Sequence, residues 1–599
     1  MKLILIYLIL VFNLFNFINC QNILKVSNVR FAQTHVIPIE GKSWNIQGST
    51  KHMSIVGKRR ALLLASFQDQ NLSYFATIWY DGGKVGMIQL NDPSQLPLTE
   101  DNGEKYSKVH HSGMIPKEWV RVGMKIQFSS FGGINGTEVS DILSPDVGQD
   151  YTLKMWILPF YLFGANDTNT QPFSKTKGID SGISKELIEK WSCSDLQADN
   201  HPIQKIDWPY FVMEPRSGNP AMVITNSDQK KDGYAIMNGV LSILWLLRGM
   251  FGESSSSIQI YSPLLHLDAK GRYADTYGGL GGSSAGTGNH RFTGIFIHEQ
   301  GHAMGLPHAG EAYDNKRKYP YKQGSLSGSE WGFDANHNEF LGTFIPPTAE
   351  LYKTCKKNSI IDSKGRCVKQ SVMQSGAGDQ SSKYRYSMFA DFEMTTIQNY
   401  FKNSIYYDET NGKYKKWNDT SKSYYAYKPI TKEKGFEGVD ENTPIERNVD
   451  IYSIIFTYST VEKPKVGKIS QIYPLLKSKG NLIRQFDPTN KKEMDSVNPK
   501  LNGEFKWYCN SSGCDYTIRV TFYDSSLKHV LLQQGKRKYK LPTGSFRDNI
   551  NDPKSSDSFM LGGVNIKANK KIKKVELLET PFAWNGIPKN PTVLVSKSF

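Results

Sequence analysis

The stretch Ile297–Gly310, IHEQGHAMGLPHAG, contains three of the chain's twelve histidines within eleven residues. On a helix over residues 292–304, His298 and His302 are four residues apart and lie one turn apart on the same face. Two imidazoles in that arrangement can hold one metal ion, and zinc is commonly bound by histidine nitrogens. The stretch therefore predicts a helix that carries a metal site.

The residues that follow this helix are suited to ending it and reversing the chain. Gly305 adopts positive φ at little cost, as a helix C-terminal cap requires, and Pro307 resists continuation of the helix. The turn can then return His308 to the metal as a third ligand. Three histidines and one water make an open tetrahedral site, which is typical of catalytic zinc. We therefore expect one catalytic Zn²⁺ ion.

Glu299 directly follows the first of these histidines and is the candidate catalytic base. It is poorly placed to act as a further ligand on the same face, but it can reach a water on the metal. Zinc lowers the pKa of its water and polarises a carbonyl oxygen. Glu299 can take the proton of that water as it attacks a peptide bond, then pass it to the leaving nitrogen. This arrangement predicts peptide hydrolysis without a covalent intermediate.

The full pattern HExxHxxGxxH is specific, because a glycine and a third histidine at fixed spacing rarely follow a chance HExxH. It resembles the metzincin clan of zinc proteases, which also has a methionine turn beneath the metal. Met373, in SVMQSGAGD, is the expected methionine of that turn. Met388, in RYSMFADF, is the alternative.

Three further segments narrow this resemblance. EWGFD, MQSGAGD and YRYSMFADFEMTTIQNYF are similar to segments of the StcE-like mucin-degrading metalloproteases, and most closely to those of the dictomallein group. The resemblance covers roughly residues 151–401. It implies that His298, His302 and His308 are zinc ligands. It also implies that Glu299 is the catalytic base and that mucin-type glycoproteins are the substrates.

The chain departs from the family pattern at two places near the motif. Ala309 follows the third histidine, where some relatives have an aromatic residue. The methionine turn reads Met-Gln-Ser-Gly instead of Met-Ala/Ser-Gly-Gly, and no tyrosine lies two residues beyond Met373. A tyrosine fifth ligand from that turn is therefore not expected. Neither departure touches the predicted ligands, but both leave the substrate preference open.

The chain has 599 residues, too many for one hydrophobic core, so several domains are expected. Residues 21–150 contain short alternating runs such as ALLLASF and YFATIWY, which predict antiparallel strands. Residues 151–406 mix strand and helix patterns around the histidine motif. Residues 407–599 return to strand-like runs such as VDIYSIIFTY. We therefore expect an α+β protein with a metzincin-like catalytic domain between N- and C-terminal β-rich domains.

Two apolar stretches bear on the location of the protein. Residues 1–20 have one lysine before an apolar run and are typical of a cleaved secretory signal peptide, with an uncleaved membrane anchor as the alternative. Residues 234–251 are barely long enough to span a membrane and contain Asn238, Ser242 and Arg248, so a buried helix of a soluble protein is expected. The protein is therefore predicted to be secreted, without stable membrane insertion after signal cleavage.

The glycine-rich stretch Gly278–Gly288, GGLGGSSAGTG, precedes the histidine motif. It lacks both the GxGxxG dinucleotide fingerprint and the lysine of a phosphate-binding loop. A flexible loop or an edge strand beside the site is therefore expected, and a phosphate site is not.

Five cysteines remain after removal of the signal peptide. In an oxidising compartment their spacing predicts two disulfides, Cys355–Cys367 and Cys509–Cys514, each closing a short loop. Cys193 is then unpaired or linked between chains. A zinc knuckle is not favoured, because neither pair has CxxC spacing or a second partner pair.

The net charge and the distribution of charged residues restrict which other classes of function the chain can have. The net charge is +16, but Lys and Arg are scattered, so a nucleic-acid binder is not favoured. Attraction to acidic extracellular partners remains compatible with this charge. Five Asn-x-Ser/Thr sequons, compatible with a secreted glycoprotein, begin at Asn71, Asn135, Asn166, Asn418 and Asn510. The second candidate function is a glycan- or cell-surface-binding protein with a vestigial metal site, although such a site has no need of Glu299.

Overall fold

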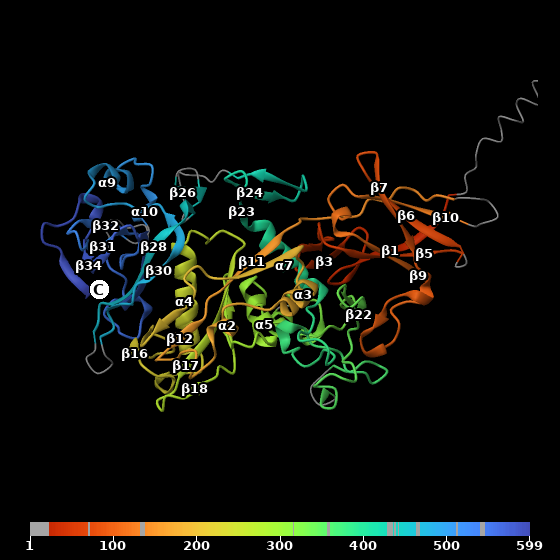
Figure 1. Ribbon diagram of the computed structural model, residues 1–599, viewed down its shortest axis with the longest axis horizontal. Coiled ribbons are helices and arrows are strands. Elements are labelled where there is room, and N and C mark those ends of the chain that lie inside the picture. The colour runs from red at the N-terminus through yellow and green to blue at the C-terminus, as the bar shows by residue number, and fades with distance from the viewer. Residues whose placement is uncertain are drawn as a thin grey trace, which may run out of the picture. The chain divides into compact units, whose positions relative to one another are not determined.

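The computed structural model describes residues 23–69, 72–131, 138–315, 317–355, 360–427, 435–436, 439–440, 443–462, 468–510, 513–538 and 545–599. They form a mixed, strand-rich protein with few helices (Figure 1). The expected signal peptide at residues 1–20 lies outside the described residues, as do the sequon asparagines Asn71 and Asn135.

The chain divides into two compact units that are interleaved along the sequence. The first comprises Met1–Thr152, Lys185–Asp195 and His308–Gln398, and the second comprises Leu153–Ser184, Leu196–Pro307 and Asn399–Phe599. The expected domain boundaries near residues 150 and 406 stay predictions.

Two antiparallel sheets lie in the first unit, with strand orders β2-β1-β5-β9 and β10-β6-β7. The apolar run ALLLASF forms β5, which is buried at every position and therefore lies at the centre of its sheet. The antiparallel strands expected in this part of the chain are confirmed. Their bounds are β1 Val26–Ala32, β2 Val36–Pro38, β5 Ala61–Phe67, β6 Ser73–Tyr80, β7 Gly83–Leu90, β9 His110–Ile115 and β10 Lys125–Phe131.

Shorter elements complete this unit. The hairpin of β3 and β4 is antiparallel, and β8 pairs in parallel with β22, which pairs with β21. Their bounds are β3 Lys42–Ile46, β4 Ser49–Met53, β8 Leu98–Thr99, β21 Gly332–Asp334 and β22 Glu339–Leu341. The helices α3 Ser181–Lys190, α6 Ala309–Asp314 and α7 Asp391–Asn403 also contribute residues to it.

The second unit has a largely parallel sheet around β17, in the order β13-β11-β17-β12-β14. All nine residues of β17 are buried, as is usual for a strand covered on both faces. β20 also pairs in parallel with β17, and β19 is antiparallel to β20. The bounds are β11 Thr152–Ile157, β12 Phe160–Leu162, β13 Asp195–Asn200, β14 Ile206–Trp208, β17 Gln259–Leu267, β18 Tyr273–Ala274, β19 Leu280–Gly282 and β20 Ala285–Gly288.

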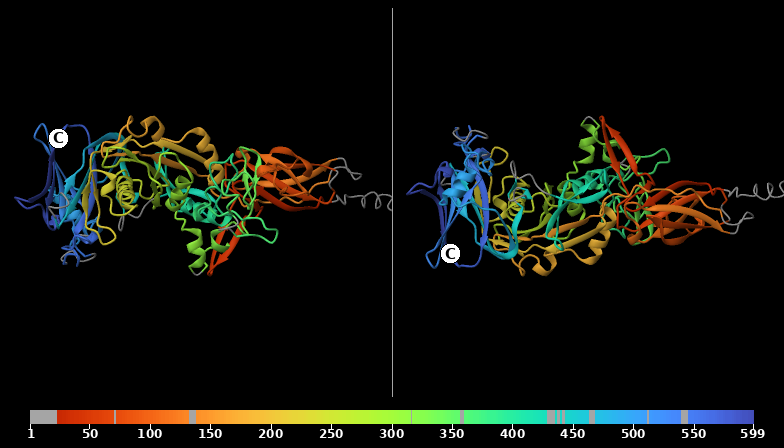
Figure 2. Two further views of the ribbon diagram at one scale, coloured as in Figure 1. Left: turned by 90° about the horizontal axis from the view of Figure 1, so that it is seen from below. Right: turned by 90° about the horizontal axis from the view of Figure 1, so that it is seen from above.

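Helix α4, Ala235–Met250, shares a hydrophobic core with strands from the C-terminal part of the chain. Leu244 and Leu247 are fully buried in the same cluster as Ile451 and Tyr473. The Nδ2 of Asn565 donates to the carbonyl of Met250 at 3.0 Å. Figures 1 and 2 show the blue C-terminal strands beside this helix.

The described C-terminal strands form three larger sheets and one two-stranded sheet, in which β26 Gly435–Phe436 pairs with β27 Val439–Asp440. The orders of the larger sheets are β29-β28-β30 with β33 on β28, β32-β31-β34-β35, and β23-β24-β25. The bounds are β23 Ile405–Asp408, β24 Lys413–Asn418, β25 Ser423–Ala426, β28 Pro444–Ser459, β29 Gln471–Ile472, β30 Leu476–Ile483, β31 Tyr516–Phe522, β32 Leu527–Leu532, β33 Phe559–Lys567, β34 Ile572–Glu579 and β35 Thr592–Ser598. The strand-like runs predicted here are confirmed.

The apolar stretch at residues 234–251 is the buried helix that its polar residues predicted. This helix, α4, spans 16 residues, and most of them are buried. Across the part of the chain that the structure describes, no helix is both long and apolar enough to cross a membrane.

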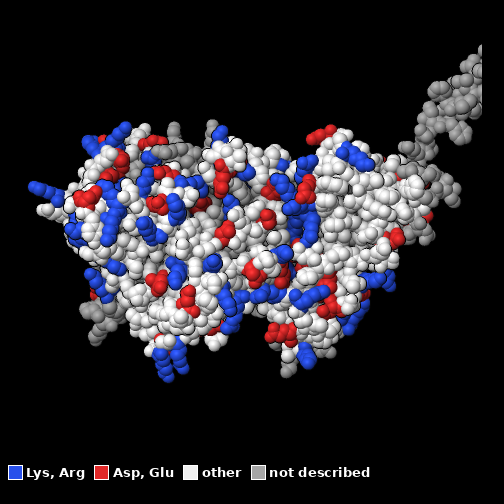
Figure 3. Space-filling model, in the orientation of Figure 1, with Lys and Arg blue, Asp and Glu red and all other residues white. Residues whose placement is uncertain are grey.

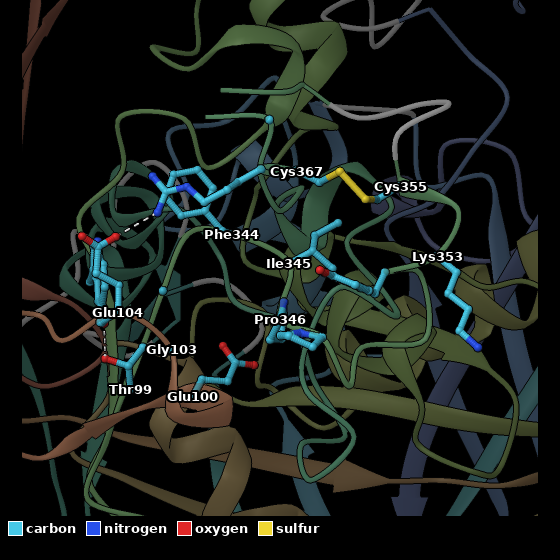
Figure 4. A pocket seen from close by; sticks show the side chains of 16 residues that line it. Thr99, Glu100, Gly103, Glu104, Phe344, Ile345, Pro346, Lys353, Cys355 and Cys367 are labelled. Atoms are coloured by element: carbon cyan, nitrogen blue, oxygen red, sulfur yellow. Dashed lines mark hydrogen bonds and ion pairs between the residues drawn. A yellow bond between two sulfur atoms is a disulfide. The ribbon is translucent and has the colours of Figure 1, made fainter. Parts of the chain in front are cut away.

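Both predicted disulfides are confirmed, Cys355–Cys367 and Cys509–Cys514. Cys193 is a free, buried thiol, and burial raises its pKa to about 12. The first disulfide lies beside a pocket of about 580 Å³ that Phe344 and Pro346 also line (Figure 4). The disulfides are consistent with an extracellular protein.

Candidate metal centre

The predicted metal-binding helix is α5, Gly294–Ala303. It begins two residues later than expected, because Phe292 has a positive φ of 49° and Thr293 is extended. It carries His298 and His302 one turn apart, and their rings lie edge to face with centroids 4.7 Å apart. The sequence prediction of a shared helical face is therefore confirmed.

Helix α5 ends next to Gly305, as the sequence predicted. Gly305 has a φ of 91°, and its N–H donates to the carbonyl of His302 at 2.9 Å. The N–H of Leu306 donates to the carbonyl of Gly301 at 3.0 Å. These two bonds are the pair that defines a Schellman C-terminal motif. The chain therefore reverses immediately before the third histidine.

The reversal brings the three histidines together. His298, His302 and His308 each offer a ligand atom, and these atoms all lie within 4.8 Å of one another. The first two side chains are half-buried, and the third is exposed. Such a cluster of nitrogen donors can hold one metal ion.

Hydrogen bonds to the ring nitrogens support this donor set. The Nδ1 of His302 lies 2.7 Å from the carbonyl oxygen of Leu306. Because a carbonyl only accepts, Nδ1 carries the proton, and Nε2 keeps its lone pair for a metal. The Nδ1 of His308 lies 3.4 Å from Oε1 of Glu311, which favours the same tautomer. The residues present therefore fit a zinc ion.

Glu299 lies beside these histidines in a confined, largely buried position. Only 7% of the residue is exposed, and burial raises the pKa of its carboxyl to about 8. A cation nearby would oppose this rise by favouring the ionised form. The environment suits a carboxyl that exchanges a proton at neutral pH.

The glycine-rich stretch forms the wall that confines Glu299. A Cβ on Gly279 would lie 2.5 Å from Cγ of Glu299, and one on Gly281 would lie 2.2 Å from its carbonyl oxygen. Only glycine therefore allows this strand to approach α5 so closely. The stretch is strand β19 paired with β20, so the expected edge strand is confirmed. Its steric role against Glu299 was not evident from the sequence.

The family model described as Peptidase M66 matches residues 100–406, just over half of the chain. The chain belongs to the peptidase M66 family. Membership of the M66 family supports a protease that acts on a protein substrate, and it implies a metal ion.

Individual M66 relatives match along nearly the whole chain. Dictomallein-3 of Dictyostelium discoideum is 74% identical over 603 residues, covering 100% of both chains. Dictomallein-1 of the same organism is 52% identical over 602 residues, again covering 100% of both. Dictomallein of Burkholderia mallei (strain SAVP1) is 39% identical over 583 residues, 96% of this chain and 83% of that protein. The predicted resemblance to the StcE-like and dictomallein proteases is confirmed.

The methionine expected beneath the metal of this M66 protein lies in a 3₁₀ turn, Val372–Gln374. Met373 is fully buried, and its N–H donates to Oγ of Ser371 at 3.0 Å. The hydroxyl of Ser371 donates in turn to the buried carboxylate of Glu393, 2.7 Å away. Ser371 and Glu393 therefore fix the turn, although the position of Met373 beneath a metal stays a prediction.

Gln374, the unusual residue of that turn, contacts the helix that starts after the third histidine. His308 is at the N-terminal cap position of α6, but its side chain forms no capping bond there. Instead, Oε1 of Gln374 accepts a hydrogen bond from the N–H of Gly310 at 2.7 Å. A Cβ on Gly310 would lie 2.6 Å from that oxygen, so the approach requires glycine. Gln374 thus caps α6 from 64 residues away.

We expect Gln374→Met to release the metal faster than Gln374→Glu does. Methionine has a similar length but no acceptor, so the N–H of Gly310 loses this bond, while glutamate retains an acceptor. Loss of this part-buried bond costs about 1–3 kcal/mol, which is about 5- to 150-fold in local opening. Hydrogen exchange at the Gly310 amide and the rate of metal capture by a chelator measure the effect. Equal exchange in the two variants would show that Gln374 does not hold the turn after His308.

Proposed function

We propose that this chain is a secreted zinc endopeptidase in which His298, His302 and His308 hold the metal and Glu299 is the catalytic base. The observation that carries the proposal is the convergence of three ligand atoms within 4.8 Å on and just after the helix that carries the largely buried Glu299. Membership of the M66 family supports the same reaction class.

Peptide hydrolysis follows from these groups. When bound, a zinc ion supplies Lewis acidity to the scissile carbonyl and to water. Glu299 accepts one proton from the attacking water, whose oxygen bonds to the carbonyl carbon. Glu299 then delivers that proton to the leaving nitrogen as the carbon–nitrogen bond breaks. Gly279 lies against Cγ of Glu299, and the residue is only 7% exposed, so little bulk water reaches its side chain.

The catalytic part of the chain is a metzincin-like domain at residues 151–406 between β-rich domains at residues 21–150 and 407–599. The helix of two histidines, the Schellman turn at Gly305 and the buried Met373 support this assignment. The family match at residues 100–406 overlaps the same region.

Secretion is supported by several features. Residues 1–20 have the pattern of a signal peptide, and the two disulfides suit an oxidising compartment. Asn166 and Asn418 begin sequons and are exposed, so glycosylation can reach both. Mass spectrometry of the secreted chain tests this, because a mature N-terminus near Gln21 is expected.

Acidic mucin-type glycoproteins are the proposed substrates. The StcE-like resemblance implies them, and the net charge of +15 after loss of Lys2 would attract them. On the face drawn in Figure 3, Lys and Arg are interspersed with Asp and Glu. On this face the charge therefore offers general attraction instead of one basic groove for nucleic acid.

Salt should weaken this attraction. Raising the salt concentration from about 0.05 to 0.5 M shortens the Debye length about threefold. We expect KM for an acidic mucin to rise several-fold over this range, while kcat/KM for a small neutral peptide changes little. Equal salt sensitivity for both substrates would remove the electrostatic argument and leave the peptidase assignment intact.

The proposed function is tested by measuring protein digestion with the metal present, removed and restored. Purified enzyme should cleave casein or a mucin, lose activity after chelation, and regain it when zinc returns. A glycan-binding protein with a vestigial site would instead bind the mucin and leave it intact. Absence of cleavage by fully zinc-loaded enzyme on glycosylated and deglycosylated substrates would refute the proposal.

A further inference from the structure

The first turn of α7 contains a buried carboxyl that takes no part in the proposed reaction. Glu393 is 2% exposed, and its Oε2 accepts from the N–H of Ala390 at 2.6 Å. Ala390 directly precedes α7, so this bond is one half of a capping box, which an uncharged glutamine could also form. Glu393 forms no ion pair with a described residue, whereas Asp391 in the same turn is paired with Lys42 at 2.6 Å. Because a buried carboxyl without a cation is costly, helix capping alone does not account for Glu393.

The same carboxyl holds the hydroxyl of a serine in the turn that contains Met373. Oγ of Ser371 lies 2.8 Å from Oε1 and 2.7 Å from Oε2 of Glu393, and Ser371 is fully buried. This hydroxyl also accepts from the N–H of Met373, and the carbonyl of Ser371 accepts from the N–H of Gln374 at 2.8 Å. Glu393 therefore anchors the residue to which the rest of the turn is bonded.

The turn continues to the segment that follows the third histidine. Gln374 caps α6 through the N–H of Gly310, and His308 lies two residues before Gly310. The contact is tight, because a Cβ on Gly324 would lie 2.6 Å from Cγ of Gln374 and 2.7 Å from the backbone nitrogen of Gly310. The N–H of Ser371 donates to the carbonyl of Gly324 at 3.0 Å. Close-packed contacts of this kind transmit a shift of the turn to the residues beside it.

The charge state of Glu393 indicates that a neutral group can replace it. Burial, assisted by the negative charge of Asp391, raises the pKa of its carboxyl to about 7, although hydrogen bonds, first of all that from Ser371, act to lower it. The neutral carboxyl is therefore accessible near pH 7. A glutamine has nearly the same shape and keeps an acceptor oxygen, so it is the conservative variant at this position.

We propose that Glu393 is a positioning residue of the metal centre, whose carboxyl holds the segment beginning at His308 in place through Ser371 and Gln374. This inference rests on the proposed function for the role of His308 as a ligand. The effect of Glu393 on that ligand passes through the turn, and capping of α7 is a separate task of the same carboxyl. All of these residues belong to the first compact unit.

Amide hydrogen exchange at Gly310 tests the path directly, in the full chain with and without zinc. Glu393→Leu removes both acceptor oxygens, so exchange should become at least about fivefold faster, the lower end of the effect of losing one buried hydrogen bond. Glu393→Gln keeps an acceptor and should stay within about twofold of wild type. Unchanged exchange at Gly310 in Glu393→Leu would overturn the proposal and leave Glu393 as a cap of α7 alone.

Two further variants separate positioning from a general loss of stability. Glu189→Leu removes another buried carboxyl of the same unit, which is 4% exposed and paired with Arg59 at 3.0 Å. It should lower the melting temperature, because Arg59 is left unpaired, but exchange at Gly310 should stay as in wild type. Ser371→Ala keeps the cap of α7 and breaks the link to the turn, so it should accelerate exchange at Gly310 as Glu393→Leu does. Equal acceleration in Glu189→Leu would show a general effect and contradict the positioning role.

The proposed order of contacts is tested by the rate at which a chelator removes zinc from the loaded enzyme. Glu393→Leu and Gln374→Met should each release zinc at least about fivefold faster than wild type. Both variants break the same path, so the double variant should release zinc about as fast as the faster single variant, because effects within one hydrogen-bond network do not add. Effects that multiply would show that the two residues act independently, which would refute the path through Gln374.

Failure of the proposed function would give a different result. If zinc-loaded wild-type enzyme cleaved no peptide or protein, the peptidase assignment would be wrong, but exchange at Gly310 in the metal-free chain would still report whether Glu393 holds the turn. If the enzyme cleaved its substrates and Gly310 were unaffected by Glu393→Leu, the positioning role alone would be refuted.

Discussion

Glu299→Gln should reduce kcat/KM for protein substrates by at least about a thousandfold, within the range expected when a general base is lost. The amide has the shape of the carboxyl but cannot accept the proton of the attacking water. His298 and His302 are unchanged, so the variant should still bind one zinc ion per chain. Stopped assays on metal-replete protein, with zinc measured by mass spectrometry, test both parts.

The matched control is Glu311→Gln, which changes the other carboxylate near the histidines. Glu311 lies on the exposed surface of α6, 3.4 Å from Nδ1 of His308. Loss of its charge should cost no more than about 10–100-fold, the range for a group that only orients a ligand. Substantial turnover by metal-replete Glu299→Gln, or a larger loss in Glu311→Gln, would contradict the role given to Glu299.

Local chemistry made the core of the site predictable from sequence. The spacing of His298 and His302 sets one helical face, and Gly305 ends the helix, because both effects act within a few residues. The disulfides were predictable for the same reason, since each closes a short loop. The polar residues within 234–251 correctly indicated a buried helix instead of a membrane span.

Long-range contacts explain what sequence reasoning missed. The role of Gly279 depends on the segment that lies against Glu299. A glycine-rich sequence does not show which neighbouring residue leaves no room for a Cβ. Gln374 was visible only as a departure from the family pattern, because its partner Gly310 lies 64 residues earlier. Asn565 reaches the end of α4 across 315 residues, so a strand pattern gave no sign of that shared core.

His308→Ala should abolish peptidase activity and weaken zinc binding by more than about a hundredfold. The expected loss of affinity exceeds the 10–100-fold typical of groups that merely orient ligands, because His308 offers one of the three proposed donor atoms. Competition with a coloured chelator measures the affinity directly, independently of turnover.

His337→Ala is the matched control, because His337 has nearly the same side-chain exposure as His308 and also has an acidic partner, but lies outside the cluster. Its side chain is 46% exposed, against 47% for His308, and its Nδ1 lies 3.1 Å from the carboxylate of Asp334, three residues away. Because His337 lies outside the cluster, removal of its exposed, acid-paired imidazole should leave zinc affinity and turnover near wild type. If His308→Ala behaved like His337→Ala, the turn after Gly305 would not deliver a ligand, and Glu311 would become the third donor to test.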